Sequence, residues 1–318
     1  MKEIGGFFGL ELSHFNKEYH TGALRLNKAR SALNYLILQK NVKKIYIPYY
    51  MCSCILEPIL DLGIEHEYYR LDEDMLPNFS KEVYDNELFL YINYFGLCDQ
   101  NVTTVVNKLN NVVVDNTQSF YSRPLNGCDT IYSPRKFFGV PDGGYLYSTD
   151  SYMIELEPSS SYQQFEFLLK RIDYSAQEAY SQFQEQERWL TGQGMKQMSR
   201  LTETMLKSID YDGVRDIRLR NFDFLHENLS KINELKIERS RDSVPMVYPL
   251  LIENNSIKEQ LISEKVYIPT YWKEVIEISE YDWFERRLVD NLVCLPIDQR
   301  WGLADMEQIL SVLKRILA

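Results

Sequence analysis

The sequence predicts an α/β fold with a mostly parallel sheet, followed by a smaller α+β unit. Between residues 28 and 115, short apolar runs typical of strands alternate with helix-compatible segments, which is the pattern of βαβ units. Residues 160–232 are polar and compatible with helices, and strand-like and helical patterns return after them. We therefore expect a large α/β domain at 1–150, a helical connection at 151–232 and a small C-terminal α+β domain at 233–318.

The elements of the first domain follow one another in regular order. Residues 28–40, "KARSALNYLILQK", place apolar side chains at helical spacing, with Asn27 as a candidate N-cap. "KKIYIPYY" is strand-like, and a short helix over 52–62 ends at Gly63. The next expected elements are strands in "IEHEYYRL" and "ELFLYINYF", a helix in "QNVTTVVNKLN", a buried strand in "NVVVDN", and strands in "DTIYS" and "GGYLYS". This alternation predicts helices on both faces of the sheet.

The second half of the chain is expected to be mainly helical until about residue 232. "GQG" at 192–194 interrupts that stretch. Beyond it, "VPMVYPLLIE", "KEQLISEKVYIP" and "LADMEQILSVLKRIL" suggest a strand, a helix and a closing helix.

Composition and charge exclude several classes of partner. Hydrophobic residues make up 45% of the 318 and charged residues 25%, as in ordinary globular proteins. The net charge of −11 argues against binding to nucleic acid backbones or anionic membranes. No apolar run approaches the roughly 20 residues that span a bilayer, and the first 20 residues lack the uninterrupted apolar core of a signal peptide. We expect a cytoplasmic protein without a nucleic acid or membrane partner.

The five cysteines do not form a recognisable framework. Only Cys52 and Cys54 are close together, as C-x-C, and no second cysteine or histidine pair follows at metal-ligand spacing. The others are Cys98, Cys128 and Cys294. We expect no metal site and no disulfides, but reduced thiols as in a cytoplasm.

Three features together point to a cofactor. The segment 27–31 lies at a helix start, where free backbone N–H groups favour an anion. Asp115 ends a buried strand, at the edge where open α/β sheets bind ligands. Lys136 follows another strand and precedes a Gly-Gly pair. An anion site, a carboxylate and a lysine are what pyridoxal phosphate (PLP) requires for its phosphate, its ring nitrogen and its Schiff base. Taken alone, each could be an ordinary surface or capping residue.

The ordered motifs resemble those of the DegT-like sugar aminotransferases, a branch of the fold-type-I PLP enzymes. That family shows an Asp-x-x-Gln or Asp-x-x-His element, a lysine and a Gly-Gly pair seven residues later. Here these are Asp115, Gln118, Lys136 and Gly143-Gly144. "ARSAL", "IPYYMCSC" and several downstream segments are also similar, so the resemblance covers nearly the whole chain. It implies the three-layer, aspartate aminotransferase-like fold of PLP-dependent transferases.

The resemblance also implies roles for particular residues. Lys136 would be the catalytic lysine, Asp115 the partner of the ring nitrogen, and Gln118 a contact to the ring or its 3-oxygen. Further cofactor contacts are expected at Ala29, Arg30, Ser133, Tyr50 and Cys52. Substrate contacts are expected at Phe7, Phe8, Arg135 and Tyr94.

Three positions depart from the family pattern. The glycine that precedes the helix arginine in the family is Ala29 here. The aromatic residue that stacks on the cofactor ring falls at or near Cys52, and Tyr49, Tyr50 and Tyr94 are alternative stacking residues. The asparagine that reaches the phosphate from the neighbouring subunit has no match in "GQGMKQMS". Lys196 or Gln197 would make that contact instead.

The activity implied is transfer of an amino group from glutamate to a keto group on a nucleotide-linked sugar, by a homodimer. Two alternatives stay open. One is a PLP enzyme that acts on a different amino or keto substrate. The other is a binding or regulatory module that keeps the fold without turnover.

Overall fold

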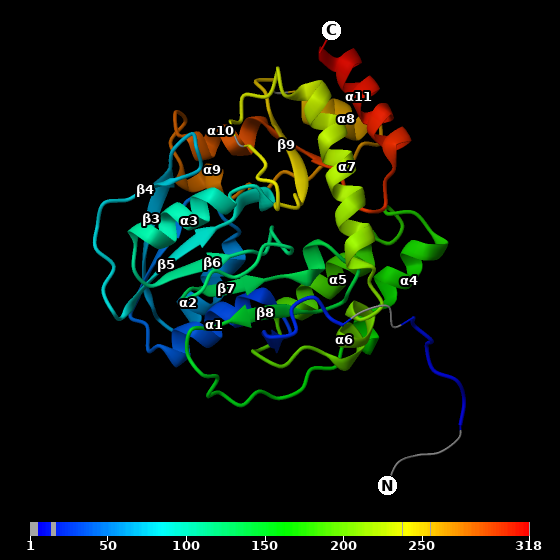
Figure 1. Ribbon diagram of the computed structural model, residues 1–318. Helices are drawn as coiled ribbons and strands as arrows, with labels where there is room; N and C mark the ends of the chain where they lie inside the picture. The colour runs from blue at the N-terminus through cyan, green and yellow to red at the C-terminus, as the bar shows by residue number, and fades with distance from the viewer. Residues whose placement is uncertain (1–5, 14–16, 237, 255, 318) are drawn as a thin grey trace.

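The computed structural model describes residues 6–13, 17–236, 238–254 and 256–317 (Figure 1). In this part of the chain, eight strands form one sheet in the order β1-β8-β7-β6-β5-β2-β3-β4. The strands are β1 (Leu24–Leu26), β2 (Lys44–Pro48), β3 (Glu65–Leu71), β4 (Pro77–Asn78), β5 (Glu87–Ile92), β6 (Val112–Asp115), β7 (Asp129–Tyr132) and β8 (Gly144–Tyr147).

The centre of this sheet is parallel, as the sequence predicts. The pairs β7–β6, β6–β5, β5–β2 and β2–β3 are parallel, whereas β8 runs antiparallel to both β7 and β1, and β4 runs antiparallel to β3. The central strands β5 and β6 are almost fully buried, which matches their continuous apolar sequences. The edge strands β1 and β4 were not predicted, because two or three residues carry no periodic pattern.

Helices cover both faces of the sheet, which confirms the predicted layering. Helix α1 (Ala29–Gln39) packs on β8 and β7 and neighbours α2 (Leu56–Asp61), while α3 (Asp99–Lys108) packs on β5 and β6. Figure 1 shows α1 and α2 on one side of the sheet and α3 on the other. The Gly-Gly pair explains how close α1 comes to β8. A Cβ on Gly144 would lie 2.5 Å from the carbonyl carbon of Lys28, so only glycine permits this approach.

The stretch after the sheet is helical and leads into a second, two-stranded sheet. The helices are α4 (Glu166–Asp173), α5 (Tyr180–Thr191), α6 (Arg200–Leu206) and α7 (Tyr211–Leu229). Strands β9 (Val247–Leu251) and β10 (Leu292–Pro296) then pair antiparallel. Around them lie α8 (Ile257–Ser263), α9 (Val275–Ile278), α10 (Phe284–Asn291) and α11 (Leu303–Leu317). Helix α7 connects the two regions and packs against α11 and β9 (Figure 1).

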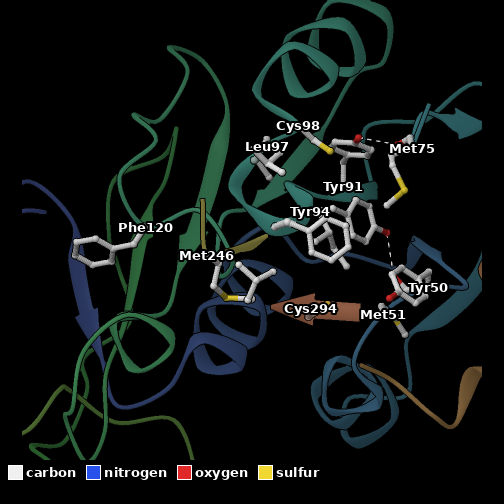
Figure 2. Close-up of a cluster of buried hydrophobic side chains, with 14 of the residues drawn as sticks. Tyr50, Met51, Met75, Tyr91, Tyr94, Leu97, Cys98, Phe120, Met246 and Cys294 are labelled. Carbon is white, nitrogen blue, oxygen red and sulfur yellow. Dashed lines mark hydrogen bonds between the residues drawn. The ribbon is translucent and has the colours of Figure 1, made fainter. Parts of the chain in front are cut away.

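The C-terminal segment is anchored at the carboxyl end of β5. There the turn Tyr94–Gly96 has left-handed backbone angles at Phe95 (φ 59°) and Gly96 (φ 71°). The Met246 N–H donates to the Phe95 carbonyl at 2.8 Å. Figure 2 shows a cluster of buried side chains in which Tyr91 points toward Met75 and Tyr94 points toward Tyr50. Met246 and Cys294, from the C-terminal segment, belong to the same cluster. One apolar core therefore runs through both sheets.

No helix in the described parts of the chain is both long enough and apolar enough to cross a membrane.

Candidate active site

Lys136 and Asp115 open onto the same cavity, at the carboxyl ends of β7 and β6. The cavity has a volume of about 360 Å³. Its wall also includes the start of α1, the turn with Cys52 and Cys54, and Tyr271 and Trp272 of the C-terminal segment. The residues expected from the sequence that line it are Ala29, Arg30, Cys52, Asp115, Gln118, Ser133, Arg135 and Lys136.

Asp115 is fixed by its position as the last residue of β6. It pairs with Ile92 of β5 and Ile131 of β7, so its backbone is held on both sides. The residue is only 6% exposed, and its Oδ1 accepts the Thr117 N–H at 2.8 Å. Within the described residues, no donor bonds to Oδ2. A buried carboxylate favours a partner for each oxygen, so Oδ2 is suited to an N–H of a bound ligand.

Lys136 and its neighbour Arg135 differ in their partners: Arg135 is paired with a carboxylate, and Lys136 bonds to a hydroxyl. Both lie on the 3-10 turn Pro134–Lys136. Arg135 forms an ion pair with Glu187 of α5, and burial lowers the pKa of its guanidinium to about 10. The Lys136 Nζ donates to Thr117 Oγ1 at 3.0 Å and forms no ion pair with a described residue. Lys136 is therefore an amine held by one neutral hydrogen bond beside the cavity.

Gln118 is nearly inaccessible, at 1% exposed, and supports the neighbouring turn. Its Oε1 accepts the Phe95 N–H at 2.8 Å. Phe95 has left-handed backbone angles, which are unfavourable for a bulky residue, so this bond helps to hold the strained turn. In the part of the chain that the structure covers, the Gln118 Nε2 has no acceptor, which leaves it available to the cavity that Gln118 lines.

The start of α1 borders one corner of the cavity. The N-cap is Lys28 rather than Asn27, so the predicted cap was wrong. The Asn27 side chain instead bonds the Gly194 carbonyl at 2.9 Å and accepts from Ser31 Oγ at 2.9 Å. The Lys28 side chain makes no capping bond, and the first turn contains no acidic residue. The backbone on either side of Lys28 pairs with Gly143 in an isolated parallel bridge, which leaves the Arg30 N–H at the cavity wall for an anion.

Carboxylates from two helices neutralise the other cations of the wall. Glu57 of α2 pairs with Lys28 at 2.8 Å and with Arg30 at 2.7 Å. Glu187 of α5 pairs with Arg135 and also lines the cavity. Sequence reasoning missed both acids, because their position depends on how α2 and α5 pack and no local motif marks them.

The aromatic residues of the wall differ from the candidates taken from the sequence. Tyr50 and Tyr94 lie outside the cavity lining, and the Tyr94 hydroxyl donates to the Tyr50 carbonyl at 2.9 Å. Tyr271 and Trp272, from the C-terminal segment, line the cavity instead. Trp272 packs edge-on against Tyr50 with ring centroids 4.5 Å apart, and its backbone is left-handed (φ 53°). The nearby Tyr49 stacks on Tyr68.

Four further candidates do not line the cavity. Phe7 and Phe8 are 98% and 92% exposed, on an N-terminal segment that extends away from the body (Figure 1). Lys196 and Gln197 lie near the start of α1 in the same chain. The Lys196 N–H donates to Asn27 Oδ1 at 3.2 Å, and the Gln197 N–H donates to the Glu157 carbonyl at 2.8 Å.

Comparison with known proteins identifies the fold. No protein-family model and no curated protein sequence matches the chain. Among solved structures, the aminotransferase TlmJ from Streptoalloteichus hindustanus is 13% identical over 93% of this chain and 85% of its own, with a TM-score of 0.66. The sugar aminotransferase CalS13 from Micromonospora echinospora is 13% identical over 92% and 87%, with a TM-score of 0.64.

A third structure gives the same result. A DegT DnrJ EryC1 StrS aminotransferase from Brucella abortus is 13% identical over 92% of this chain and 85% of its own, with a TM-score of 0.63. These likenesses confirm the predicted fold class, that of the PLP-dependent aminotransferases. At 13% identity they establish the fold alone.

Proposed function

We propose that the protein is a PLP-dependent aminotransferase of the DegT-like type that acts on a sugar. One observation carries the proposal. Lys136, Asp115 and the open start of α1 border a single cavity, in a chain with the fold of sugar aminotransferases. The same three groups would be needed to hold the amine-reactive, ring-nitrogen and phosphate ends of PLP.

The residues of the cavity fit this cofactor. The N–H group of Arg30 and the hydroxyl of Ser133 can bind the phosphate, because both residues border the cavity. Asp115 can accept an N–H from the pyridine ring through the oxygen that no described donor uses. The cavity volume of about 360 Å³ lies within the usual range for small-molecule sites, about 300–1,000 Å³. When bound, PLP would supply an electron sink for a carbanion next to nitrogen.

The chain would contribute positioning, charge and proton transfer. The Lys136 Nζ would be the point of covalent attachment and, once free, would take the proton from the α-carbon of the amino donor. Thr117 orients Nζ through its 3.0 Å hydrogen bond. The Asp115 carboxylate would keep a proton on the ring nitrogen. Tyr271 and Trp272 cover the cavity from the C-terminal side and would exclude water.

We further propose glutamate as the amino donor and a nucleotide-linked keto sugar as the acceptor. The support is the resemblance in motifs, together with neighbours in fold that are described as sugar aminotransferases. Arg135 is not free to bind an anionic substrate group while it pairs with Glu187. A substrate carboxylate or phosphate would have to displace Glu187 from it.

We also propose a homodimer. Helices α4 and α5 and their connection leave large apolar side chains exposed, namely Leu169, Ile172, Tyr174 and Tyr180. Glu187 and Thr191, near the end of α5, line the cavity, so a second copy that covers this face would lie beside the site. Analytical ultracentrifugation tests this. Ile172→Asp should shift the dimer toward monomer, whereas Ile232→Asp, at an exposed position after α7, should not.

Single-turnover reaction with amino donors tests the activity. Glutamate added to the PLP-loaded protein should abolish the visible absorption band and yield 2-oxoglutarate. A different amino acid that does this faster would indicate the alternative in which another substrate is used. A protein that binds PLP but responds to no amino donor would contradict the aminotransferase proposal and support a non-catalytic module.

A further inference from the structure

The five cysteines fall into two classes that differ in their surroundings. Cys98, Cys128 and Cys294 are buried in the core, and burial raises the pKa of each thiol, to about 12 for Cys98 and Cys128. Cys52 and Cys54 are partly exposed and both line the Lys136 cavity. Thiolates react and thiols in apolar surroundings are inert, so only the second pair is placed to react.

Cys52 and Cys54 lie at the start of one short turn. Cys52 has an extended backbone conformation (φ −69°, ψ 127°) and precedes the 3-10 turn Ser53–Ile55. The Ile55 N–H closes this turn on the Cys52 carbonyl at 3.1 Å, and the Ser53 N–H donates to Glu274 Oε1 at 3.0 Å. The turn is thus held both from within and by the C-terminal segment.

The two cysteines are two residues apart on the same cavity wall and differ in acidity. The neighbouring Cys54 thiol lowers the pKa of Cys52 to about 6, and the nearby charge of Lys136 acts in the same direction. The neighbouring Cys52 thiol, with burial, raises the pKa of Cys54. Cys52 is therefore the more acidic of the two thiols.

We propose that Cys52 and Cys54 form a peroxide-reactive modification site in the wall of the Lys136 cavity, which closes to a Cys52–Cys54 disulfide. The Cys52 thiolate attacks a hydroperoxide: a sulfur–oxygen bond forms, the oxygen–oxygen bond breaks, and the leaving alkoxide or hydroxide takes a proton from solvent. Cys52 becomes a sulfenic acid, oxidised by two electrons, and the peroxide is reduced to an alcohol or water.

Cys54 completes the reaction. Its thiol loses a proton, its sulfur attacks the Cys52 sulfur, and the sulfur–oxygen bond breaks with release of water. Two thiols and one hydroperoxide thus give one disulfide, one alcohol or water, and one further water.

Peptide mass spectrometry tests the proposal on the full chain. The protein is treated with one equivalent of hydrogen peroxide at pH 7, alkylated, unfolded and digested. The peptide with Cys52 and Cys54 should lose two hydrogens and resist alkylation until a reductant is added. Met51 in the same peptide is buried and would gain an oxygen instead, so the two products differ in mass.

Variants separate the two roles. Cys54→Ser should leave a sulfenic acid on Cys52 that dimedone traps, and Cys52→Ser should leave Cys54 unoxidised at the same dose. Cys128→Ser is the matched control and should not change disulfide formation. Alkylation of Cys52 should rise with a midpoint near pH 6, against about 8.5 for a free cysteine, and Lys136→Met should move that midpoint upward. Equal oxidation of all five cysteines, or an unmodified Cys52–Cys54 peptide, would overturn the proposal.

Discussion

The Lys136 cavity and the tyrosine cluster at the end of β5, which contains Tyr50, Tyr91 and Tyr94, differ in how many of their polar atoms have hydrogen-bond partners. In the cluster, two buried hydroxyls are matched with carbonyls: Tyr91 donates to the Met75 carbonyl at 2.8 Å and Tyr94 donates to the Tyr50 carbonyl at 2.9 Å (Figure 2). In the cavity, Asp115 Oδ2 has no partner among the described residues, and the Lys136 Nζ has a single neutral one. The first region is built to be stable, and the second keeps bonding capacity for a ligand.

The same contrast separates the cations of the molecule. Arg218 is 2% exposed, bonds the Met246 carbonyl at 3.0 Å through Nη1, and stacks on the Phe137 ring at 4.5 Å. Its charge is thus used to join α7 to the C-terminal segment and to the turn after Lys136. Lys136 contributes to no such junction. Substitutions should therefore affect either folding or cofactor binding, depending on the region they touch.

The largest effect is expected from Lys136→Ala, which should abolish covalent retention of PLP. Its side chain borders a cavity, so its removal leaves no void in the core, and the free energy of unfolding without PLP should change by no more than about 0.5 kcal/mol. Absorbance after gel filtration measures retention, and urea unfolding measures stability. A variant that retains the visible band would contradict the assignment of Lys136.

Arg218→Met should show the opposite pattern. It removes a buried donor from backbone carbonyls, and an unsatisfied buried acceptor costs about 1–3 kcal/mol. Because the contact with the Phe137 ring is lost as well, we expect the free energy of unfolding in urea without PLP to fall by about 2–3 kcal/mol. Covalent capture of PLP in the folded fraction should persist. An unchanged free energy of unfolding would mean that the contacts of Arg218 do not stabilise the fold.

Asp115→Asn should leave PLP attached but slow the single-turnover reaction with glutamate. The amide can hold the ring nitrogen without providing the negative charge that favours its protonated form. Hydrogen bonds to charged groups contribute about 1.5–3 kcal/mol, which corresponds to a rate lower by at least about tenfold. Stopped-flow absorbance gives the rate, and a rate equal to that of the wild type would make Asp115 purely structural.

Tyr94→Phe tests the cluster with the smallest change. It removes the hydroxyl that bonds the Tyr50 carbonyl, and the free energy of unfolding should fall by about 1 kcal/mol. PLP capture should not change, because Tyr94 does not line the cavity. Tyr281→Phe, at a highly exposed tyrosine, is the control and should have no effect on either measurement.

The sequence predicted those parts of the site that belong to a local pattern. Asp115 and Lys136 each follow a strand whose apolar run is visible in the sequence, and parallel strands bring such ends together. The start of α1 was predicted from the helical spacing of its apolar residues, and Ser133 from the family resemblance. Strands β1, β4 and β10 were not, because pairing with distant strands, rather than local pattern, defines them.

Residues from distant segments escaped prediction for a related reason. Glu187 faces Arg135 across 52 positions of the chain, and Trp272 faces Tyr50 across a much longer separation. Their roles depend on how α5 and the C-terminal segment pack, which no local spacing encodes. The predicted Asn27 cap failed because the nearby Gly194–Lys196 segment competes for the same side chain.

Borohydride reduction of the PLP-loaded protein tests the central claim most directly, because it makes the bond between cofactor and lysine permanent. Peptide mass spectrometry should then find one phosphopyridoxyl group, on Lys136. Lys28, which borders the same cavity but pairs with Glu57, should remain unmodified. An adduct on Lys28 or on any other lysine, or no adduct at saturating PLP, would contradict the account.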